Sequence, residues 1–314
     1  MRIVFVGTPD FASHILEHLI SSWNIVGVVT QPDKRGGRGR KVLAPPVKVV
    51  AEKYGIPVIQ PPTINTEEAI DFIKKKKPDI LLVAAYGRIL KETLLEIPKF
   101  GSYNVHASLL PKYRGAAPIQ RAIENGEKET GITIFKMVKE LDAGPIALQK
   151  TLKIGDFETF GDVYAKLIDL AKEAVDEFLR LLSSNKVVLV PQDDSKVTYA
   201  PKIRKEDTFV DFSMTSEKVK NKIRAYDPTP GAKAVIKGQV VKLFEVKDLE
   251  EGNSEEPYGK ILKIEEDGAW IKTGDGKILL GKIQFPGKKV LSFSEARNGR
   301  LIREGDILKG GACI

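Results

Sequence analysis

Short apolar runs alternate with helical patterns through the first half of this 314-residue chain, and this alternation constrains its fold more than any other feature. The runs are β-branched and bounded by turn or helix-breaking residues, which is typical of buried strands. We expect such strands at residues 3–7, 25–30, 58–59 and 80–85, and further strands at residues 101–108 and 131–137. Apolar residues at helical spacing predict helices at residues 11–20, 66–76 and 160–182. Strand–helix–strand alternation predicts a doubly wound, mostly parallel, Rossmann-like sheet with helices on both faces.

The pattern changes after residue 182, where residues 183–205 are polar, hold two prolines and have the character of a linker. A helix at 216–225 is expected next, followed by short alternating strands at 232–236, 239–245, 259–265, 269–273 and 277–283. Such strands, separated by Gly-rich turns, predict a small antiparallel, OB-like β-barrel. The expected division is an α/β domain at 1–188, a linker at 189–207 and a β-domain at 208–314.

Gly7 ends the first expected strand, where a dinucleotide-binding sheet places its glycine-rich turn. That turn needs the pattern G-x-G-x-x-G so that the backbone can approach a pyrophosphate. This chain has only the first glycine, and Pro9 removes one of the amide donors. We therefore interpret Gly7 as part of a structural turn and do not expect nicotinamide or flavin binding.

The composition favours a soluble, cytoplasmic protein. No apolar run reaches the roughly 18 residues of a membrane span, and the first residues enter a strand without a signal-peptide pattern. The one cysteine, Cys313, excludes an intrachain disulfide, which fits a reducing compartment. His14 and His18 share a helix face, but no further ligand completes an evident set, so no metal site is expected.

Asn104 and His106 are the residues most suggestive of chemistry, because alternation along a strand puts both on one face. A carboxamide and an imidazole at a strand end can donate the converging hydrogen bonds that the oxyanion of acyl transfer requires. Asp142 lies in a tight turn after a later strand, and near His106 it would orient the ring and stabilise its charged form. The alternative is structural, since an Asp in a D-x-G turn is often a turn former. No Ser–His–acid or Cys–His order stands out.

A family resemblance decides between these interpretations. Asn104-x-His106 runs into Ser108-Leu109-Leu110-Pro111-Lys112-Tyr113-Arg114-Gly115, and with Asp142 this segment resembles the signature of the folate-dependent formyltransferases, which use 10-formyltetrahydrofolate. The similarity extends over essentially the whole chain. It implies that Asn104, His106 and Asp142 are catalytic and that the reaction is a direct transfer without a covalent nucleophile or metal. It also implies a folate pocket along Ser108, Leu109, Leu110, Pro111, Arg114 and Gly115 and along the turn formed by Ala85, Tyr86 and Gly87.

The acceptor is indicated by a basic loop at residues 34–48, which contains no carboxylate. Acceptors in this family include methionyl-tRNA, a sugar-nucleotide amine and glycinamide ribonucleotide, and the resemblance is closest to the members that formylate methionyl-tRNA. Those members carry a comparable basic insertion, which implies that Arg38 foremost, and Arg35, Arg40 and Lys41 beside it, contact tRNA. Arg and Lys side chains suit phosphate contacts. We therefore expect initiator methionyl-tRNA as the acceptor, in translation initiation, and a monomeric enzyme.

Three other interpretations of this loop remain open. A charge run is often no more than a solvated surface loop. A sugar-nucleotide formyltransferase would share the Asn–His–Asp set without needing the loop, whereas a non-enzymatic RNA-binding protein would need the loop without that set.

Overall fold

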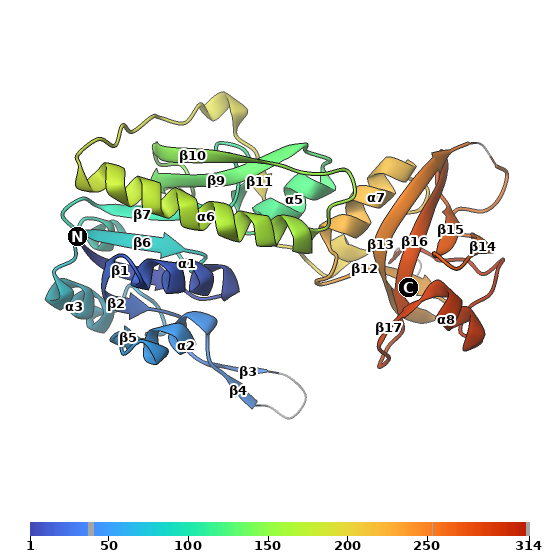
Figure 1. Ribbon diagram of the computed structural model, residues 1–314, viewed down its shortest axis with the longest axis horizontal. Helices are drawn as coiled ribbons and strands as arrows, with labels where there is room; N and C mark the ends of the chain where they lie inside the picture. The colour runs from blue at the N-terminus through green and yellow to red at the C-terminus, as the bar shows by residue number, and fades with distance from the viewer. Residues whose placement is uncertain (37–40, 253, 312–314) are drawn as a thin grey trace. The chain divides into compact units, whose positions relative to one another are not determined.

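The computed structural model describes residues 1–36, 41–252 and 254–311, which belong to two compact units (Figure 1). The first unit comprises Met1–Ala116, Thr130–Leu152 and Lys166–Ala200, and the second comprises Ala117–Glu129, Lys153–Ala165 and Pro201–Ile314. Within the described residues, no helix has both the length and the apolar character needed to cross a membrane. The domain boundaries expected from the sequence stay a prediction.

The first unit is built on a seven-stranded sheet of order β10-β9-β7-β6-β1-β2-β5. Its strands are β1 (Arg2–Gly7), β2 (Asn24–Val29), β5 (Val58–Ile59), β6 (Ile80–Ala84), β7 (Ser102–His106), β9 (Glu129–Lys136) and β10 (Ile146–Lys153). From β5 to β7 all neighbouring strands are parallel, and β9 runs antiparallel to β7. The expected α/β fold with a mostly parallel sheet is confirmed.

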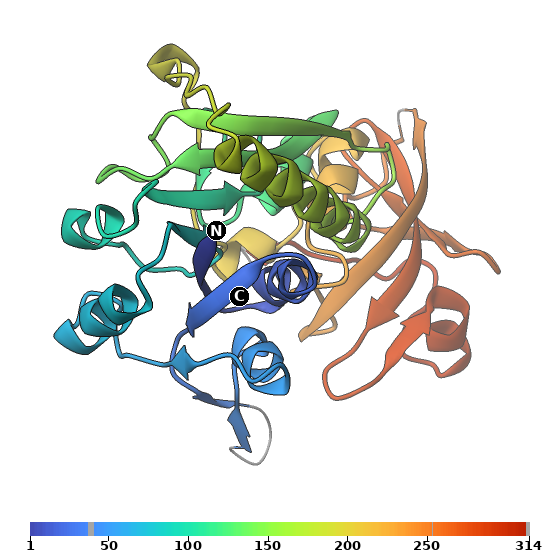
Figure 2. The ribbon, with the colours of Figure 1, turned by 60° about the vertical axis from the view of Figure 1, so that its left-hand side comes forward.

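Helices cover both faces of this sheet. They are α1 (Asp10–Ile20), α2 (Pro46–Lys53), α3 (Glu67–Lys76), α4 (Glu92–Leu95) and α6 (Phe160–Ser183). Figures 1 and 2 show α1 and the later part of α6 on the same face. On the other face, Ile73 of α3 and Leu94 of α4 pack in one buried cluster with Val4 and Val83 of the sheet. The sheet is therefore buried on both sides, which explains why its central strands β1 and β6 read as continuous apolar runs.

Gly7 fits its structural interpretation. A Cβ atom at this position would lie 2.6 Å from Cβ of Ala12 and 2.8 Å from the carbonyl oxygen of Ala84. Glycine therefore allows α1 and the end of β6 to approach the end of β1 closely.

Two pairs of short strands flank the main sheet. β3 (Lys34–Gly36) and β4 (Lys41–Leu43) form an antiparallel pair, and β8 (Arg114–Gly115) pairs in parallel with β11 (Tyr199–Ala200). A single turn of 3-10 helix, Asp194–Lys196, precedes β11. The segment expected to be a linker therefore forms regular backbone pairs in the first unit.

The second unit contains an antiparallel sheet of order β12-β13-β16-β15-β14, with β17 paired to β16. The strands are β12 (Ala232–Ile236), β13 (Gln239–Glu251), β14 (Ile261–Ile264), β15 (Ala269–Lys272), β16 (Gly276–Gln284) and β17 (Val290–Ser292). Its helical segments are α5 (Pro118–Glu124), the 3-10 turn Glu206–Thr208, α7 (Ser216–Ala225) and α8 (Phe293–Asn298). The expected antiparallel C-terminal sheet is confirmed.

A buried polar network joins the three chain segments of the second unit. The hydroxyl of Tyr226 donates to Oε2 of Glu124 at 3.0 Å, and burial, reinforced by this carboxylate, raises the pKa of Tyr226. Nη1 of Arg224, a fully buried side chain, donates to the carbonyl oxygens of Gly155 and Glu158 at 3.1 and 3.2 Å. These bonds satisfy groups whose burial is otherwise costly, so they hold α5 and residues 153–165 with the C-terminal part of the chain.

Candidate active site

The candidate site lies where the strand order of the parallel sheet reverses. β2 and β5 lie on one side of β1, while β6 and the later strands lie on the other. Ligands of such sheets bind beyond the carboxyl ends of the strands at this reversal. Residues 85–87 directly follow β6, and both Asn104 and His106 lie in the last three residues of β7. The structure therefore brings these predicted residues to the same edge of the sheet.

Asn104 presents an unsatisfied polar group. The ring of Tyr103, on the opposite face of β7, packs 4.7 Å from the ring of Phe178 in α6, so Asn104 projects away from this helix. Asn104 is the only partly buried residue of β7, and its Oδ1 atom is buried without a hydrogen-bond partner among the described residues. A buried polar atom left unpaired costs about 1–3 kcal/mol and calls for an explanation. A polar substrate at this carboxamide would supply one.

The ring of His106 is held by the main chain. Its Nε2 atom lies 2.9 Å from the carbonyl oxygen of Tyr113, and because a carbonyl can only accept, Nε2 carries the proton and donates. The rings of His106 and Phe135 form a T-shaped contact, with an interplanar angle of 78° and the ring centroids 6.5 Å apart. Nδ1 is therefore the ring nitrogen left to exchange a proton with a substrate.

Asp142 lies beside this free nitrogen. Its Oδ2 atom is 3.8 Å from Nδ1 of His106, and both side chains are at most 10% exposed. The same oxygen accepts the Gly115 N–H at 2.8 Å, and the residue has a left-handed φ of 49°. The distance to His106 exceeds that of a hydrogen bond, so the orientation of the ring is set by the Tyr113 carbonyl and not by Asp142.

Hydrogen bonds within the loop and to neighbouring strands hold the expected folate loop, residues 108–115, in its conformation. Oγ of Ser108 donates to the carbonyl oxygen of Lys112 at 2.7 Å. Thr133, opposite His106 on β9, donates to the Ser108 carbonyl at 2.6 Å and accepts from the Leu110 amide at 3.2 Å. Gln149 donates to the Leu110 carbonyl at 3.0 Å. Thr133 and Gln149, which the sequence did not single out, therefore shape the loop.

The second expected folate segment is a tight turn. Ala85 and Gly87 have left-handed φ values of 46° and 75°, and both are exposed. Tyr86 between them is 2% exposed, and burial raises the pKa of its hydroxyl. Nε2 of Gln31 donates to the Tyr86 carbonyl at 2.6 Å. This bond links the turn to the segment that follows β2, because Gln31 is the second residue after that strand. A ligand here would meet the backbone of the turn, because the Tyr86 ring belongs to the core.

Gln192 is the main site residue that sequence reasoning missed. Its Oε1 atom accepts from Nε and Nη2 of Arg114 at 3.1 and 2.8 Å. Its Nε2 atom donates to the carbonyl oxygens of Asp142 and Gly144, both at 2.8 Å. Arg114, expected to contact folate, is buried and bonded to Gln192 and Asp194. The polar residues of the expected linker carry no apolar periodicity, so no sequence signal placed them at the site.

The basic segment is carried by the β3–β4 hairpin. Lys34 pairs with Leu43 in the antiparallel register, and Lys34 is exposed. The side chains of Val42 and Leu43 are also exposed. The structure describes none of the four side chains predicted to contact tRNA. Arg38 and Arg40 lie outside the described residues, and so do the side chains of Arg35 and Lys41.

The two histidines of α1 have carboxylate neighbours. Nε2 of His14 lies 3.4 Å from Asp10, and Nε2 of His18 lies 2.7 Å from Oδ2 of Asp176 on α6. Among residues 1–36, 41–252 and 254–311, no group of three His, Cys, Asp or Glu side chains could hold a metal ion. Cys313 lies outside the described residues.

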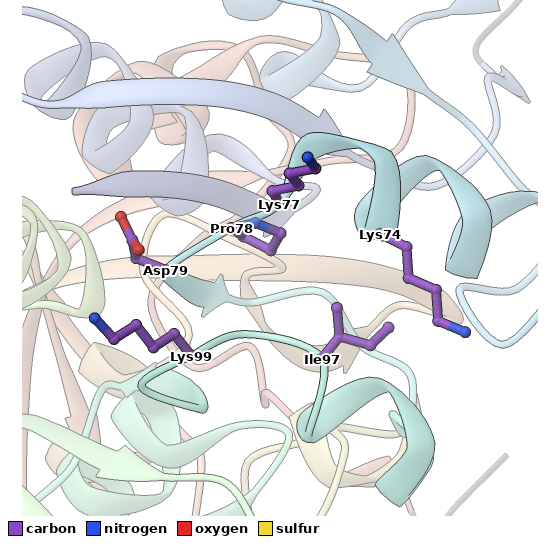
Figure 3. A pocket seen from close by; sticks show the side chains of 6 residues that line it. All are labelled: Lys74, Lys77, Pro78, Asp79, Ile97 and Lys99. Carbon is purple, nitrogen blue, oxygen red and sulfur yellow. The ribbon is translucent and has the colours of Figure 1, made fainter.

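A surface pocket of about 430 Å³ lies at the other end of the parallel sheet (Figure 3). Its lining residues follow α3 or precede β6 and β7: Lys74, Lys77, Pro78, Asp79, Ile97 and Lys99. Figure 3 shows the three lysine amines pointing in different directions. Lys74 lies in the last turn of α3, where cations complement the negative helix end. This pocket is separate from the candidate active site.

Two family models match most of the chain. Residues 1–179 match the model described as "Formyl transferase", and residues 202–301 match "Formyl transferase, C-terminal domain". Among similar curated proteins is the methionyl-tRNA formyltransferase of Thermotoga maritima, 58% identical over 306 residues, which are 97% of each chain. The enzyme of the same name from Thermosipho africanus is 54% identical over 98% of this chain and 99% of its own.

Solved structures share the fold at low sequence identity. A sugar 3N-formyl transferase, solved in the presence of dTDP and 5-N-formyl-THF, is 20% identical with a TM-score of 0.66, covering 92% of this chain and 99% of its own. HypX from Aquifex aeolicus, in complex with tetrahydrofolic acid, is 20% identical with a TM-score of 0.63, and the match covers 95% of this chain and 46% of HypX.

Proposed function

The chain belongs to the formyl transferase family, and from this premise we propose that it transfers the formyl group of 10-formyltetrahydrofolate to the α-amino group of initiator methionyl-tRNA. The observation that carries the reaction is the convergence of Asn104, His106 and Asp142 at the carboxyl end of β7. The choice of acceptor is supported by relatives of nearly equal length whose printed name is methionyl-tRNA formyltransferase.

We propose that the acceptor amine attacks the formyl carbon directly. An α-amino group has a pKa of about 8, so part of it is neutral at physiological pH and already nucleophilic. A bond forms between the amine nitrogen and the formyl carbon, and the carbonyl oxygen becomes an oxyanion. The Asn104 carboxamide donates to this oxyanion, while its Oδ1 atom offers an acceptor for an N–H of the amine. The acceptor role uses Oδ1, which has no hydrogen-bond partner among the described residues.

His106 moves the proton in this proposal. Because Nε2 is committed to the Tyr113 carbonyl, Nδ1 takes the proton that the amine loses. The resulting imidazolium is stabilised by Asp142 and adds a second donor near the oxyanion. When the bond between the formyl carbon and the folate nitrogen breaks, Nδ1 returns the proton to that nitrogen. The proton and the formyl group are thus accounted for without a covalent enzyme intermediate.

The folate is expected to lie against the segments named from the sequence. Backbone groups of Ala85, Tyr86 and Gly87 border the strand ends on one side, and the loop carrying Ser108, Leu109, Leu110, Pro111, Arg114 and Gly115 borders them on the other. Because Ser108 and Arg114 are hydrogen-bonded within the protein, we assign them the shaping of this loop. The half-buried Leu109 and Pro111 are better placed to contact the folate.

A sugar-nucleotide amine is the second candidate acceptor, because enzymes of this fold act on such substrates. The basic β3–β4 hairpin favours tRNA instead, with Arg35, Arg38, Arg40 and Lys41 as the proposed phosphate contacts. We expect the enzyme to act in the cytoplasm as a monomer.

A parallel formyl-transfer assay tests this function. The protein and 10-formyltetrahydrofolate are offered methionyl-tRNA, unacylated tRNA or a sugar-nucleotide amine. We expect transfer to methionyl-tRNA alone, weakening as salt increases. Transfer only to the sugar nucleotide would overturn the choice of acceptor, and transfer to none of the three would overturn the activity.

A further inference from the structure

The side chain of Gln192 makes four hydrogen bonds, which use both of its donors and both of its acceptor sites. Two donors of Arg114 meet its Oε1 atom, and two carbonyl oxygens, of Asp142 and Gly144, meet its Nε2 atom. A carboxamide has two acceptor sites and two donors, so every one is used. Its orientation is also fixed, because a guanidinium can only donate and a carbonyl can only accept. Its four neighbours, residues 190, 191, 193 and 194, are exposed while Gln192 is half-buried.

The segment that carries Gln192 is anchored on both sides. Val190 exchanges two backbone hydrogen bonds with Ile146, at 2.8 and 2.9 Å. Further along, Tyr199 and Ala200 of β11 pair with β8. Gln192 is thus held at a set distance from β8 and from the Asp142 turn (Figure 1 shows the segment between α6 and β11).

Both ends of the Gln192 carboxamide act on the position of the Asp142 carboxylate. One end of its carboxamide holds the main chain of Asp142, which has an unfavourable left-handed φ. The other end holds Arg114, whose neighbour Gly115 donates its N–H to Oδ2 of Asp142. Asp194, the other partner of Arg114, is 87% exposed and so contributes little.

We propose that Gln192 is a positioning residue for formyl transfer, which sets the Asp142 carboxylate at its distance from Nδ1 of His106. The proposal rests on the proposed function for its effect on rate, and on geometry alone for its effect on the Asp142 turn. Asp142 makes no hydrogen bond to His106, so its effect on the ring depends on this distance.

Two substitutions separate this role from simple anchoring of Arg114. Gln192→Ala removes all four hydrogen bonds. Gln192→Glu keeps the Oε1 oxygen that accepts both hydrogen bonds from Arg114. It replaces the NH₂ group, which donates to the Asp142 and Gly144 carbonyls, with an oxygen that repels them. Under the proposal both variants lower kcat by about 10- to 100-fold, with little change in KM for methionyl-tRNA. Ser195→Ala is the matched control, because Ser195 lies in the same segment and its hydroxyl donates to Oδ1 of Asp193.

Amide exchange provides a readout that needs no activity. The Gly115 N–H donates to Asp142, whereas the N–H groups of Arg114 and Ala116 donate to Thr198 and Ala200. We expect both Gln192 variants to speed exchange at Gly115 while leaving the two flanking amides protected. Unchanged exchange at Gly115, loss of protection at all three amides, or wild-type behaviour of Gln192→Glu would overturn the proposal. If the wild-type protein does not formylate methionyl-tRNA, the proposed function fails, and exchange at Gly115 still decides the positioning role.

A double-mutant cycle with Asp142→Asn completes the test of the rate effect. A residue that acts through Asp142 adds little once the carboxylate is gone, so Gln192→Ala should change kcat of the Asp142→Asn variant less than about twofold. Fully additive losses would contradict the proposal.

Discussion

Oδ2 of Asp142 lies 3.8 Å from Nδ1 of His106 and accepts its short hydrogen bond from the Gly115 amide instead. The carboxylate is thus fixed by the backbone of β8, and the ring is fixed separately by the Tyr113 carbonyl. The two groups face each other without a hydrogen bond between them. In the proposed mechanism, Nδ1 takes and returns a proton beside this carboxylate.

Asp142→Asn tests the electrostatic role of this carboxylate. The amide keeps an acceptor for the Gly115 N–H but loses the charge that stabilises the imidazolium. We expect kcat to fall by roughly 100-fold with KM little changed, which is less than the roughly 10⁴-fold loss seen where an Asp holds a catalytic His by a hydrogen bond. Steady-state kinetics measure both constants. A variant with the wild-type kcat would remove Asp142 from the mechanism.

Arg38→Ala combined with Arg40→Ala tests the basic hairpin. Each lost phosphate contact should raise KM for methionyl-tRNA and reduce the salt dependence by about one unit of slope, while KM for the folate stays the same. The control is Lys74→Ala with Lys75→Ala, which removes the same charge from the end of α3. Equal effects of the two double variants would show that net charge, not the hairpin, attracts the tRNA.

Gly115→Ala tests the close approach of β8 and β11. Gly115 has φ +125°, and a Cβ atom there would lie 2.7 Å from the carbonyl oxygen of Ala200. We expect a loss of about 1–3 kcal/mol in stability together with reduced kcat, because Asp142 loses its partner. Thermal unfolding and kinetics measure the two effects. Gly55 also has a positive φ, of +65°, but a Cβ atom there would have no neighbour within 4 Å, so Gly55→Ala should cost stability without loss of kcat.

The strand ends that carry the site could be predicted from the sequence, whereas much of the hydrogen bonding around them could not. Strands β1 and β6 are buried on both faces, so they leave continuous apolar runs. Strand β10, at the sheet edge, alternates partly buried with exposed residues and was missed. Helix α5 was missed as well, although Pro118 at its start is a recognisable helix signal.

The site residues divide in the same way. Asn104 and His106 share a strand, so their common face follows from alternation alone. The contact of Gln192 with Asp142 joins residues 50 positions apart through polar atoms. Such a contact depends on tertiary structure and produces no periodic pattern. The same holds for the network around Glu124 and Tyr226 in the second unit.

Asp227→Asn tests a pH dependence of stability in the second unit. Burial, reinforced by nearby carboxylates, raises the pKa of the Asp227 carboxyl above its ordinary value of 3.8, against the opposing hydrogen bond from the Glu245 amide. The folded protein therefore binds this proton more tightly than the unfolded chain, and the associated stability is lost as pH rises from 3.8 through the raised pKa.

The Asn side chain keeps the acceptor for Glu245 but cannot ionise. We therefore expect Asp227→Asn to gain stability relative to the wild-type protein as pH rises from 3.8 through the raised pKa of Asp227, as measured by urea unfolding. A stability difference that stays constant across this range would contradict the raised pKa.

The central claim is that Asn104 stabilises the oxyanion during formyl transfer. Its direct test is the single-turnover rate of formyl transfer from 10-formyltetrahydrofolate to methionyl-tRNA, compared between the wild-type protein and Asn104→Ala. We predict a rate about 100- to 1,000-fold lower in the variant, with binding of both substrates retained. A rate within about twofold of the wild-type value would contradict the account.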